Sequence, residues 1–226
     1  MRRSAGERAG TWETRFGRLK ARCRLAALMA AVLVVCTGNV CRSPVAEGLV
    51  RATLQARFGA SAPSVASTGV AGWKGSGADP NSVAAAAERG VDITAHRGRR
   101  MSGRDIEEAT LVLAMALEHV EAIARSAPDA LPRTFMLKEL VRLLEAMPPA
   151  AGGDPLDLLA QRVDAAEALR RSGFTGNPYD DDVADPLGLP LEAFRAMTWE
   201  LGEWVERLDA GLFGRARERA SAADGT

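Results

Sequence analysis

Cysteine and histidine are scarce in this sequence of 226 residues, which has three cysteines and two histidines. A disulfide framework needs several cysteines at regular spacing, and most zinc sites need cysteines or histidines in close pairs. Cys23, Cys36 and Cys41 form no such framework, and His96 and His119 have no ligand-spaced partner, so we expect both histidines at a helix or loop surface. The scarcity excludes a disulfide scaffold and most zinc sites, and it leaves the chemistry of one cysteine as the main possibility.

An excess of charge is also missing, because 29 basic residues balance 29 acidic ones. A strongly basic chain is what holds a nucleic-acid backbone or an anionic membrane. We therefore expect no nucleic-acid partner. The hydrophobic share of 47% and the charged share of 26% are those of an ordinary globular protein, and the length suits one domain with extensions.

The longest apolar run, Leu25–Cys36, has twelve residues and is too short to span a bilayer. It follows a segment with eight basic side chains, an order also found in signal peptides. No small-x-small cleavage site follows the run, and β-branched residues fill its second half, so we predict a buried parallel strand at 31–35. Residues 1–28 are then a basic N-terminal extension, and we expect a cytoplasmic protein without a membrane span.

Strand and helix patterns alternate from residue 31 onward. The predicted strands are 31–35, 64–68, 110–115 and 133–136, and the predicted helices are 44–58, 80–89, 102–108, 117–125, 137–146, 156–171 and 191–212. This alternation predicts an α/β fold, a three-layer α/β/α sandwich with a central four-stranded parallel sheet. We predict one domain over 29–215, with an insertion at about 147–176 that begins with a Pro- and Gly-rich stretch, and a C-terminal tail at 216–226.

Between the first predicted strand and the first predicted helix lies the segment Cys36-Thr37-Gly38-Asn39-Val40-Cys41-Arg42-Ser43. In open α/β sheets ligands bind at this edge, and backbone amides at a helix N-terminus bind anions. The helix end and Arg42 favour a thiolate at Cys36, which makes it a nucleophile, and Ser43 can hydrogen-bond the sulfur. Gly38 permits close approach of a ligand, and Asn39 tolerates a left-handed conformation. The competing interpretation is that Cys36 simply ends a core strand.

The longer string Val-Cys-Thr-Gly-Asn-Val-Cys-Arg-Ser-Pro-Val-Ala-Glu, residues 35–47, resembles the signature of the low-molecular-weight protein tyrosine phosphatases, C-x-G-N-x-C-R-S-P-x-A-E. The resemblance continues in Ser67-Thr68-Gly69, Trp73, Val112–Met115 and Asp185-Pro186, and it covers about 31–212 except 147–176. It implies a phosphatase that needs no metal or cofactor. Its implied partner is a phosphotyrosine-containing protein, such as a bacterial tyrosine kinase.

The resemblance also implies a two-step phosphoryl transfer and a role in it for each site residue. Cys36 attacks the phosphorus while Arg42 and the amides of residues 37–43 hold the phosphoryl oxygens. Asp185 protonates the leaving phenolate and then acts as the base for the hydrolytic water. Trp73 is a candidate wall of the substrate pocket. The acidic run 180–182 is predicted to form a solvated loop, with its members as substitutes for Asp185.

Two positions depart from the family pattern, and a third matches it but has two possible roles. Leu187 stands where many members have an aromatic residue, and Ala116 stands where the family often has Asp. Cys41 matches the second cysteine of many members, which can trap an oxidised nucleophile as a Cys36–Cys41 disulfide. A small buried residue is the other interpretation of Cys41.

Other functions stay open at this point. An arsenate reductase that uses an external small thiol needs no cysteine beyond Cys41. A phosphoarginine phosphatase is a second alternative. Phosphatases of that kind with a similar loop have Thr before the second cysteine, whereas this chain has the aliphatic Val40 there. A catalytically inactive phosphate-binding module is the third, and the joint presence of Cys36, Arg42, Ser43 and Asp185 weakens it.

Overall fold

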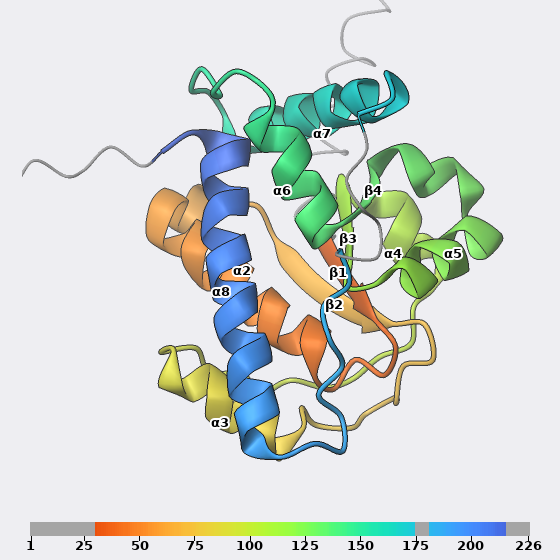
Figure 1. Cartoon of the computed structure of the whole chain (residues 1–226), viewed down its shortest axis with the longest axis vertical. Coiled ribbons are helices and arrows are strands. Elements are labelled where there is room, and N and C mark those ends of the chain that lie inside the picture. The colour runs from red at the N-terminus through yellow and green to blue at the C-terminus, as the bar shows by residue number, and fades with distance from the viewer. Residues whose placement is uncertain (1–29, 175–180, 216–226) are drawn as a thin grey trace, which may run out of the picture.

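The computed structural model describes residues 30–174 and 181–215. The predicted N-terminal extension with Cys23, the start of the acidic loop with Asp180, and the predicted tail therefore lie outside the described residues. Four strands form one sheet in which all neighbours run parallel, in the order β2-β1-β3-β4 (Figure 1). Their bounds are β1 Val32–Cys36, β2 Val65–Gly69, β3 Leu111–Ala114 and β4 Thr134–Met136.

Seven α-helices within residues 30–174 and 181–215 follow the predicted order. They are α2 Arg42–Phe58, α3 Pro80–Glu88, α4 Gly103–Glu108, α5 Leu117–Ser126, α6 Leu137–Glu145, α7 Pro155–Arg171 and α8 Leu191–Phe213. Two 3₁₀ turns, Gly59–Ser61 and Pro128–Arg133, were not among the predicted elements. Helix α2 begins two residues earlier than predicted, at Arg42, so the predicted anion loop is shorter and its arginine belongs to the first helical turn.

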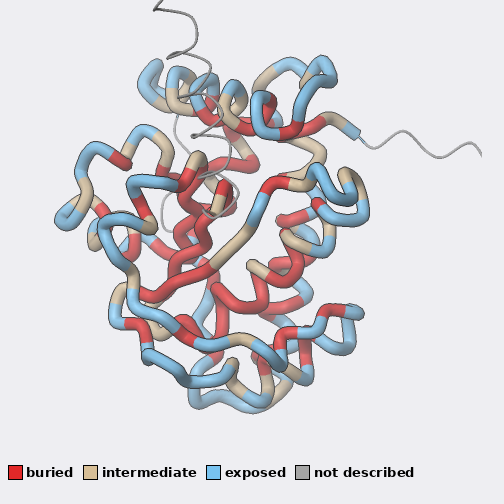
Figure 2. Tube along the Cα trace, turned by 180° about the vertical axis from the view of Figure 1, so that it is seen from behind, coloured by how far each residue is buried: buried red, intermediate tan, exposed pale blue. Residues whose placement is uncertain are grey.

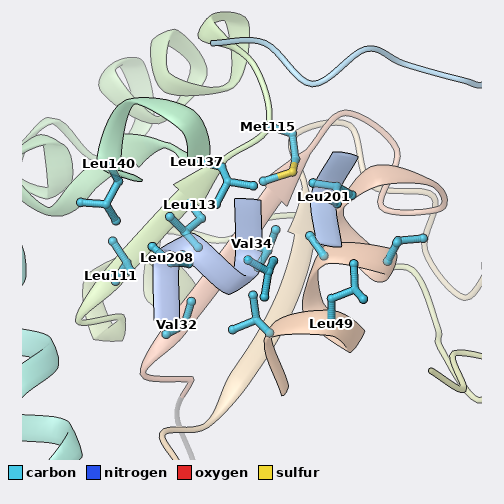
Figure 3. Close-up of a cluster of buried hydrophobic side chains, with 14 of the residues drawn as sticks. Val32, Val34, Leu49, Leu111, Leu113, Met115, Leu137, Leu140, Leu201 and Leu208 are labelled. Atoms are coloured by element: carbon cyan, nitrogen blue, oxygen red, sulfur yellow. The ribbon is translucent and has the colours of Figure 1, made fainter. Parts of the chain in front are cut away.

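Side chains of β1 alternate between two hydrophobic clusters, as the period of two in a strand requires. Val32 and Val34 belong to the cluster shared with α2 and α8, where Leu49 and Leu208 lie (Figure 3). Leu33 and Val35 face the opposite cluster, formed with α4 and α5. Figure 2 shows the buried residues concentrated in the interior of the molecule and the exposed ones around its periphery. The predicted three-layer α/β/α sandwich with a four-stranded parallel sheet is confirmed.

Helix α7 lies inside the region that the sequence predicted as an insertion. Figure 1 shows it at the end of the molecule opposite α3. Arg162 ties it to its neighbours by donating to the carbonyl oxygens of Leu144 at 3.3 Å and Gly211 at 3.0 Å, and Leu159 of the same helix is fully buried. The helix is thus packed onto the domain through α6 and α8. Across residues 30–174 and 181–215, no helix is long and apolar enough to cross a membrane.

Candidate active site

The loop between β1 and α2 is held through its backbone carbonyls. The carbonyl oxygens of residues 36–40 accept hydrogen bonds in order from Val70 N, from Ala71 N and Gly72 N, from Trp73 N, from His96 Nε2 and from Asp79 N, at 2.8–3.2 Å. In a trans peptide the N–H points away from the preceding carbonyl. The amides of residues 37–41 therefore point to the opposite side of the loop, where Asn39 N lies 3.3 Å from the Cys36 sulfur. The arrangement is an anion cradle with the thiol at its centre.

Asn39 fixes the turn of this loop. It has φ = +58°, the left-handed conformation that the sequence indicated, and it is fully buried. Its Nδ2 donates to Ser43 Oγ at 2.9 Å and to Ser67 Oγ at 2.8 Å, while its Oδ1 accepts from Arg99 N at 2.9 Å. Both ends of the amide are satisfied, which offsets the unfavourable backbone conformation.

The Cys36 thiol lies on the floor of the site and is 2% exposed. Its sulfur is 2.9 Å from Ser43 Oγ, which also lies 3.5 Å from the Thr68 carbonyl oxygen. A hydroxyl at this distance stabilises a thiolate and, later, a departing sulfur.

Arg42 projects from the first turn of α2 and is 4% exposed. Its Nη2 donates to Thr37 Oγ1 at 3.0 Å and to Asp185 Oδ2 at 2.6 Å, and its Nη1 donates to the Val183 carbonyl oxygen at 3.3 Å. Its buried Nε has no hydrogen-bond partner among residues 30–174 and 181–215. The guanidinium is thus fixed beside the amide cradle with donor capacity left for an oxyanion.

Asp185 arrives from a different part of the chain, on the loop before α8. Val183 N donates to the Met115 carbonyl oxygen at 2.8 Å, which joins this loop to the end of β3. Leu117 N donates to Asp182 Oδ1 at 2.8 Å, and Lys138 Nζ donates to the Asp182 carbonyl oxygen at 2.8 Å. These contacts place Asp185 over the pocket, with Asp182 satisfying an amide of the first turn of α5.

The expectation of a solvated acidic loop is wrong for Asp181. This residue is 2% exposed, and its carboxylate forms an ion pair with Arg142 of α6. A buried carboxylate needs such a partner because desolvation of an unpaired charge is costly. Asp182 is exposed but supports α5, and neither residue lines the pocket with Cys36.

The pocket above the loop is lined by Cys36, Thr37, Gly38, Val40, Cys41, Arg42, Trp73, Asp185 and Leu187. All the predicted site residues line this pocket except Asn39 and Ser43, which are fully buried and contact Cys36 from outside the pocket. Trp73 is 50% exposed, and a side chain at Gly38 would lie 3.6 Å from its ring. The upper walls are apolar, because Trp73, Leu187 and Val40 form them.

His119 is the site residue that the sequence analysis placed wrongly, since it is fully buried rather than on a surface. Its Nε2 lies 3.0 Å from Thr37 Oγ1. Burial, and then the charge of Arg42, lower its pKa from 6.5 to about 4, so the ring is neutral near pH 7. The four-residue spacing to the buried Ile123 was the available signal, because both share one face of α5. His96 is half-buried and binds the Asn39 carbonyl oxygen, so it is not a free surface residue either.

Cys41 is buried, and neither it nor Cys36 is in a disulfide. Burial and then the negative charge of Asp79 raise the pKa of the Cys41 thiol from 9.0 to about 12. Cys41 is therefore a neutral thiol at the site, whereas the chemistry of a nucleophile needs a thiolate.

Comparisons with known proteins agree with this geometry. Residues 31–153 match the family model described as low molecular weight phosphotyrosine protein phosphatase. A probable low molecular weight protein-tyrosine-phosphatase, EpsP of Ralstonia solanacearum, is 34% identical over 113 residues, which are 50% of this chain and 74% of that protein. A protein-arginine-phosphatase of Geobacillus stearothermophilus is 32% identical over 177 residues, 78% of this chain and 92% of that protein.

Among solved structures, a mutant of the YwlE arginine phosphatase with a phosphorylated active-site serine superposes with a TM-score of 0.59 at 28% identity. The match covers 80% of this chain and 94% of that one. With the signature loop, the fold and these relatives in agreement, the chain belongs to the low molecular weight phosphotyrosine protein phosphatase family.

Proposed function

We propose that this protein hydrolyses phosphotyrosine monoesters through a phosphocysteine intermediate. The observation that carries the proposal is the position of the Cys36 sulfur, 2.9 Å from Ser43 Oγ and inside a ring of backbone amides closed by Arg42. A thiol so placed meets the phosphorus of a bound monoester while the amides and the guanidinium hold its three non-bridging oxygens. Cys41 also lines this pocket, but burial raises the pKa of its thiol to about 12, so Cys41 is neutral near pH 7.

In the first step the Cys36 thiolate forms a sulfur–phosphorus bond as the bond between phosphorus and the phenolic oxygen breaks. The leaving oxygen takes a proton from Asp185, whose carboxyl lies across the pocket beside Arg42. Ser43 supports the thiolate until the bond forms. A neutral phenol leaves, and the phosphoryl group stays on Cys36.

In the second step water attacks the phosphorus and the sulfur leaves as a thiolate. Asp185, now ionised, accepts a proton from the water, and inorganic phosphate is released. Ser43 Oγ stabilises the departing sulfur at the same distance. A related mutant arginine phosphatase carries its phosphoryl group on the active-site serine, which supports a phosphoenzyme on this fold.

Tyrosine is the substrate residue that the pocket supports best. The thiol lies at the floor, so a substrate has to place its phosphoryl group deep, and a flat ring fits between apolar walls. Trp73 and Leu187 provide those walls, and Val40 adds an aliphatic contact near the phosphate. We propose a phosphotyrosine-containing protein as partner, a bacterial tyrosine kinase among the candidates. Several relatives named as protein-tyrosine-phosphatases support this.

Phosphoarginine is the second candidate substrate. The relative aligned over 78% of this chain is a protein-arginine-phosphatase. Leu187, in place of an aromatic side chain, weakens the stacking surface that would favour a phenyl ring. A guanidinium leaving group needs the same Cys36, Arg42 and Asp185, so the wall residues decide between the two substrates.

Two organisational features belong to the same proposal. We propose a cytoplasmic enzyme, since both described cysteines are free thiols and a reducing compartment keeps them so. We also propose that the region 147–176 is an insertion in the phosphatase domain, since α7 packs on the outside of α6 and α8 at the end opposite α3.

The test measures hydrolysis of a phosphotyrosine peptide, hydrolysis of a phosphoarginine peptide, and reduction of arsenate by an added small thiol. Each reaction is followed with wild type and with Cys36→Ser. We expect hydrolysis of the phosphotyrosine peptide to be fastest and to be lost in Cys36→Ser. A preference for phosphoarginine would select the second candidate, and reduction of arsenate alone would select the arsenate reductase. Equal rates for wild type and Cys36→Ser would contradict every cysteine-based function, including the one proposed.

A further inference from the structure

The hydroxyl of Thr37, the residue after Cys36 in the anion loop, has three hydrogen-bond partners and no capacity for a fourth. Its Oγ1 accepts from Arg42 Nη2 at 3.0 Å and lies 3.1 Å from Glu118 Oε1 and 3.0 Å from His119 Nε2. A carboxylate can only accept, so the single hydroxyl proton of Thr37 points to Glu118. The oxygen then has two lone pairs, one for Arg42 and one for His119.

His119 must therefore donate to Thr37, which places its proton on Nε2. The geometry agrees, because Nε2 also lies 3.2 Å from Glu118 Oε1, and both neighbours are acceptors in this arrangement. The other ring nitrogen, Nδ1, is buried without a partner among the described residues. A protonated, unpartnered Nδ1 would be a buried donor left unsatisfied, which again favours the Nε2–H tautomer.

The imidazole is thus fully buried, and only one of its two ring nitrogens, Nε2, has a hydrogen-bond partner among the described residues. An apolar side chain would fill the same space without an unsatisfied nitrogen. What only the imidazole supplies is the hydrogen bond to Thr37, and through Thr37 a fixed acceptor for Arg42. This is the sign of a side chain retained for positioning rather than for packing.

We propose that His119 is a positioning residue that holds the Thr37 hydroxyl so that one lone pair faces Arg42. The proposal rests on the proposed phosphatase function. In that mechanism Asp185 is protonated when it acts as acid, so its ion pair with Arg42 is absent from the reactive form. Arg42 then keeps the Thr37 hydroxyl and the Val183 carbonyl as its acceptors. Without His119, Thr37 can rotate and the guanidinium loses one of these two contacts.

The test uses two variants, His119→Phe without a donor and His119→Gln with one. For His119→Phe we expect kcat/KM for an aryl phosphate to fall about tenfold, the value of one net hydrogen bond, and inhibition by inorganic phosphate to weaken by a similar factor. His119→Gln should restore most of both. Glu121→Ala, at an exposed position of the same helix, is the control and should behave as wild type.

A double-mutant cycle with Thr37→Val separates positioning from general damage. If His119 acts through Thr37, His119→Phe should change phosphate inhibition less than twofold once the hydroxyl is gone. An undiminished tenfold effect in the Thr37→Val background would overturn the proposal, as would a folded His119→Phe enzyme with wild-type phosphate binding. Phosphate binding can be measured by calorimetry even if the protein does not hydrolyse phosphotyrosine. Failure of the proposed function and failure of the His119 proposal are thereby distinguished.

Discussion

Arg42 Nη2 and Asp185 Oδ2 lie 2.6 Å apart across the mouth of the pocket, although 143 positions separate the two residues in the sequence. A phosphoryl group that enters the pocket is a dianion, and it competes with the Asp185 carboxylate for the Arg42 guanidinium. In the proposed mechanism, binding of substrate releases Asp185 from Arg42 and leaves it free to face the leaving oxygen. The ion pair aligns the two groups before substrate arrives.

Asp185→Asn keeps a side chain that can bind Arg42 but removes the transferable proton. We expect kcat to fall by about 10² to 10⁴. The loss should be greater for phenyl phosphate than for p-nitrophenyl phosphate, because nitrophenolate is a weaker base and leaves without a proton more easily. Steady-state kinetics with both esters checks this. Asp182→Asn should cost less than about threefold, since Asp182 contacts α5 rather than the pocket; a reversed order of the two variants would move the acid role to Asp182.

Gly69 lets β2 approach the anion loop. A Cβ at this position would lie 2.5 Å from the Thr37 carbonyl oxygen and 2.9 Å from Asn39 N, which is closer than van der Waals contact allows. We expect Gly69→Ala to lower the free energy of unfolding by about 1–3 kcal/mol and to weaken phosphate binding. Urea denaturation and phosphate inhibition measure the two effects. The control is Gly77→Ala, where nothing lies within 4 Å, and a loss as large in this control would refute the steric explanation.

Arg142 neutralises the buried carboxylate of Asp181. In Arg142→Leu the carboxylate stays buried without its partner, and we expect the free energy of unfolding to fall by about 3 kcal/mol. Replacing both residues removes the uncompensated charge, so the double variant Arg142→Leu/Asp181→Leu should recover much of that loss. Chemical denaturation of the three proteins supplies the comparison. If the double variant is no more stable than the single one, the ion pair is not what Arg142 contributes.

Cys41 should resist alkylation in the folded enzyme. Its thiol is buried and has a pKa of about 12, so almost none is ionised at pH 7.5. We expect iodoacetamide to leave Cys41 unmodified in a Cys23→Ser/Cys36→Ser variant, as seen by mass spectrometry. The same variant in urea should take one label. Labelling of Cys41 in the native protein would show that the thiol is accessible.

His119 makes the stability depend on pH. Its pKa is about 4 in the folded protein and 6.5 as the ordinary value, so the unfolded chain binds more protons between these limits. The contribution of neutral His119 to the free energy of unfolding is therefore fully present above pH 6.5. It is lost as the pH falls toward 4, by up to about 1.4 kcal/mol per pH unit. The difference in unfolding free energy between wild type and His119→Gln isolates this contribution from that of the carboxylates. A difference that is flat from pH 7 to 4 would contradict the assignment.

The order of strands and helices follows from local patterns, which is why it was predictable. The apolar run before Cys36 and the helix signals at Pro44 and Gly59 depend on neighbours within one turn or one strand. The loop itself was predictable for the same reason, since its amides, arginine and thiol are contiguous. The boundary error at α2 arose because Arg42 and Ser43 adopt helical backbone without any capping side chain to mark the start.

The environment of the loop depends on contacts between distant segments, and no local pattern encodes these. His119 pairs with Thr37 across 82 positions, and Asp181 pairs with Arg142 across 39. A histidine and an aspartate read alone are typical of solvent-exposed positions. Only the fold shows that the loop between β1 and α2 brings Thr37 to His119 and that α6 brings Arg142 to Asp181.

The carbonyls of the anion loop are bound mainly by backbone N–H groups of residues 70–73 and 79. Apart from Gly72, where a Cβ would lie 2.3 Å from Arg100 Cα, such support does not depend on which side chains these positions carry, provided that none of the donors is proline. Substitutions there can accumulate while the anion cradle keeps its shape, but an inserted or deleted residue would shift every donor against its carbonyl at once. The catalytic loop thus imposes a rule of length, rather than of identity, on a segment that performs no chemistry.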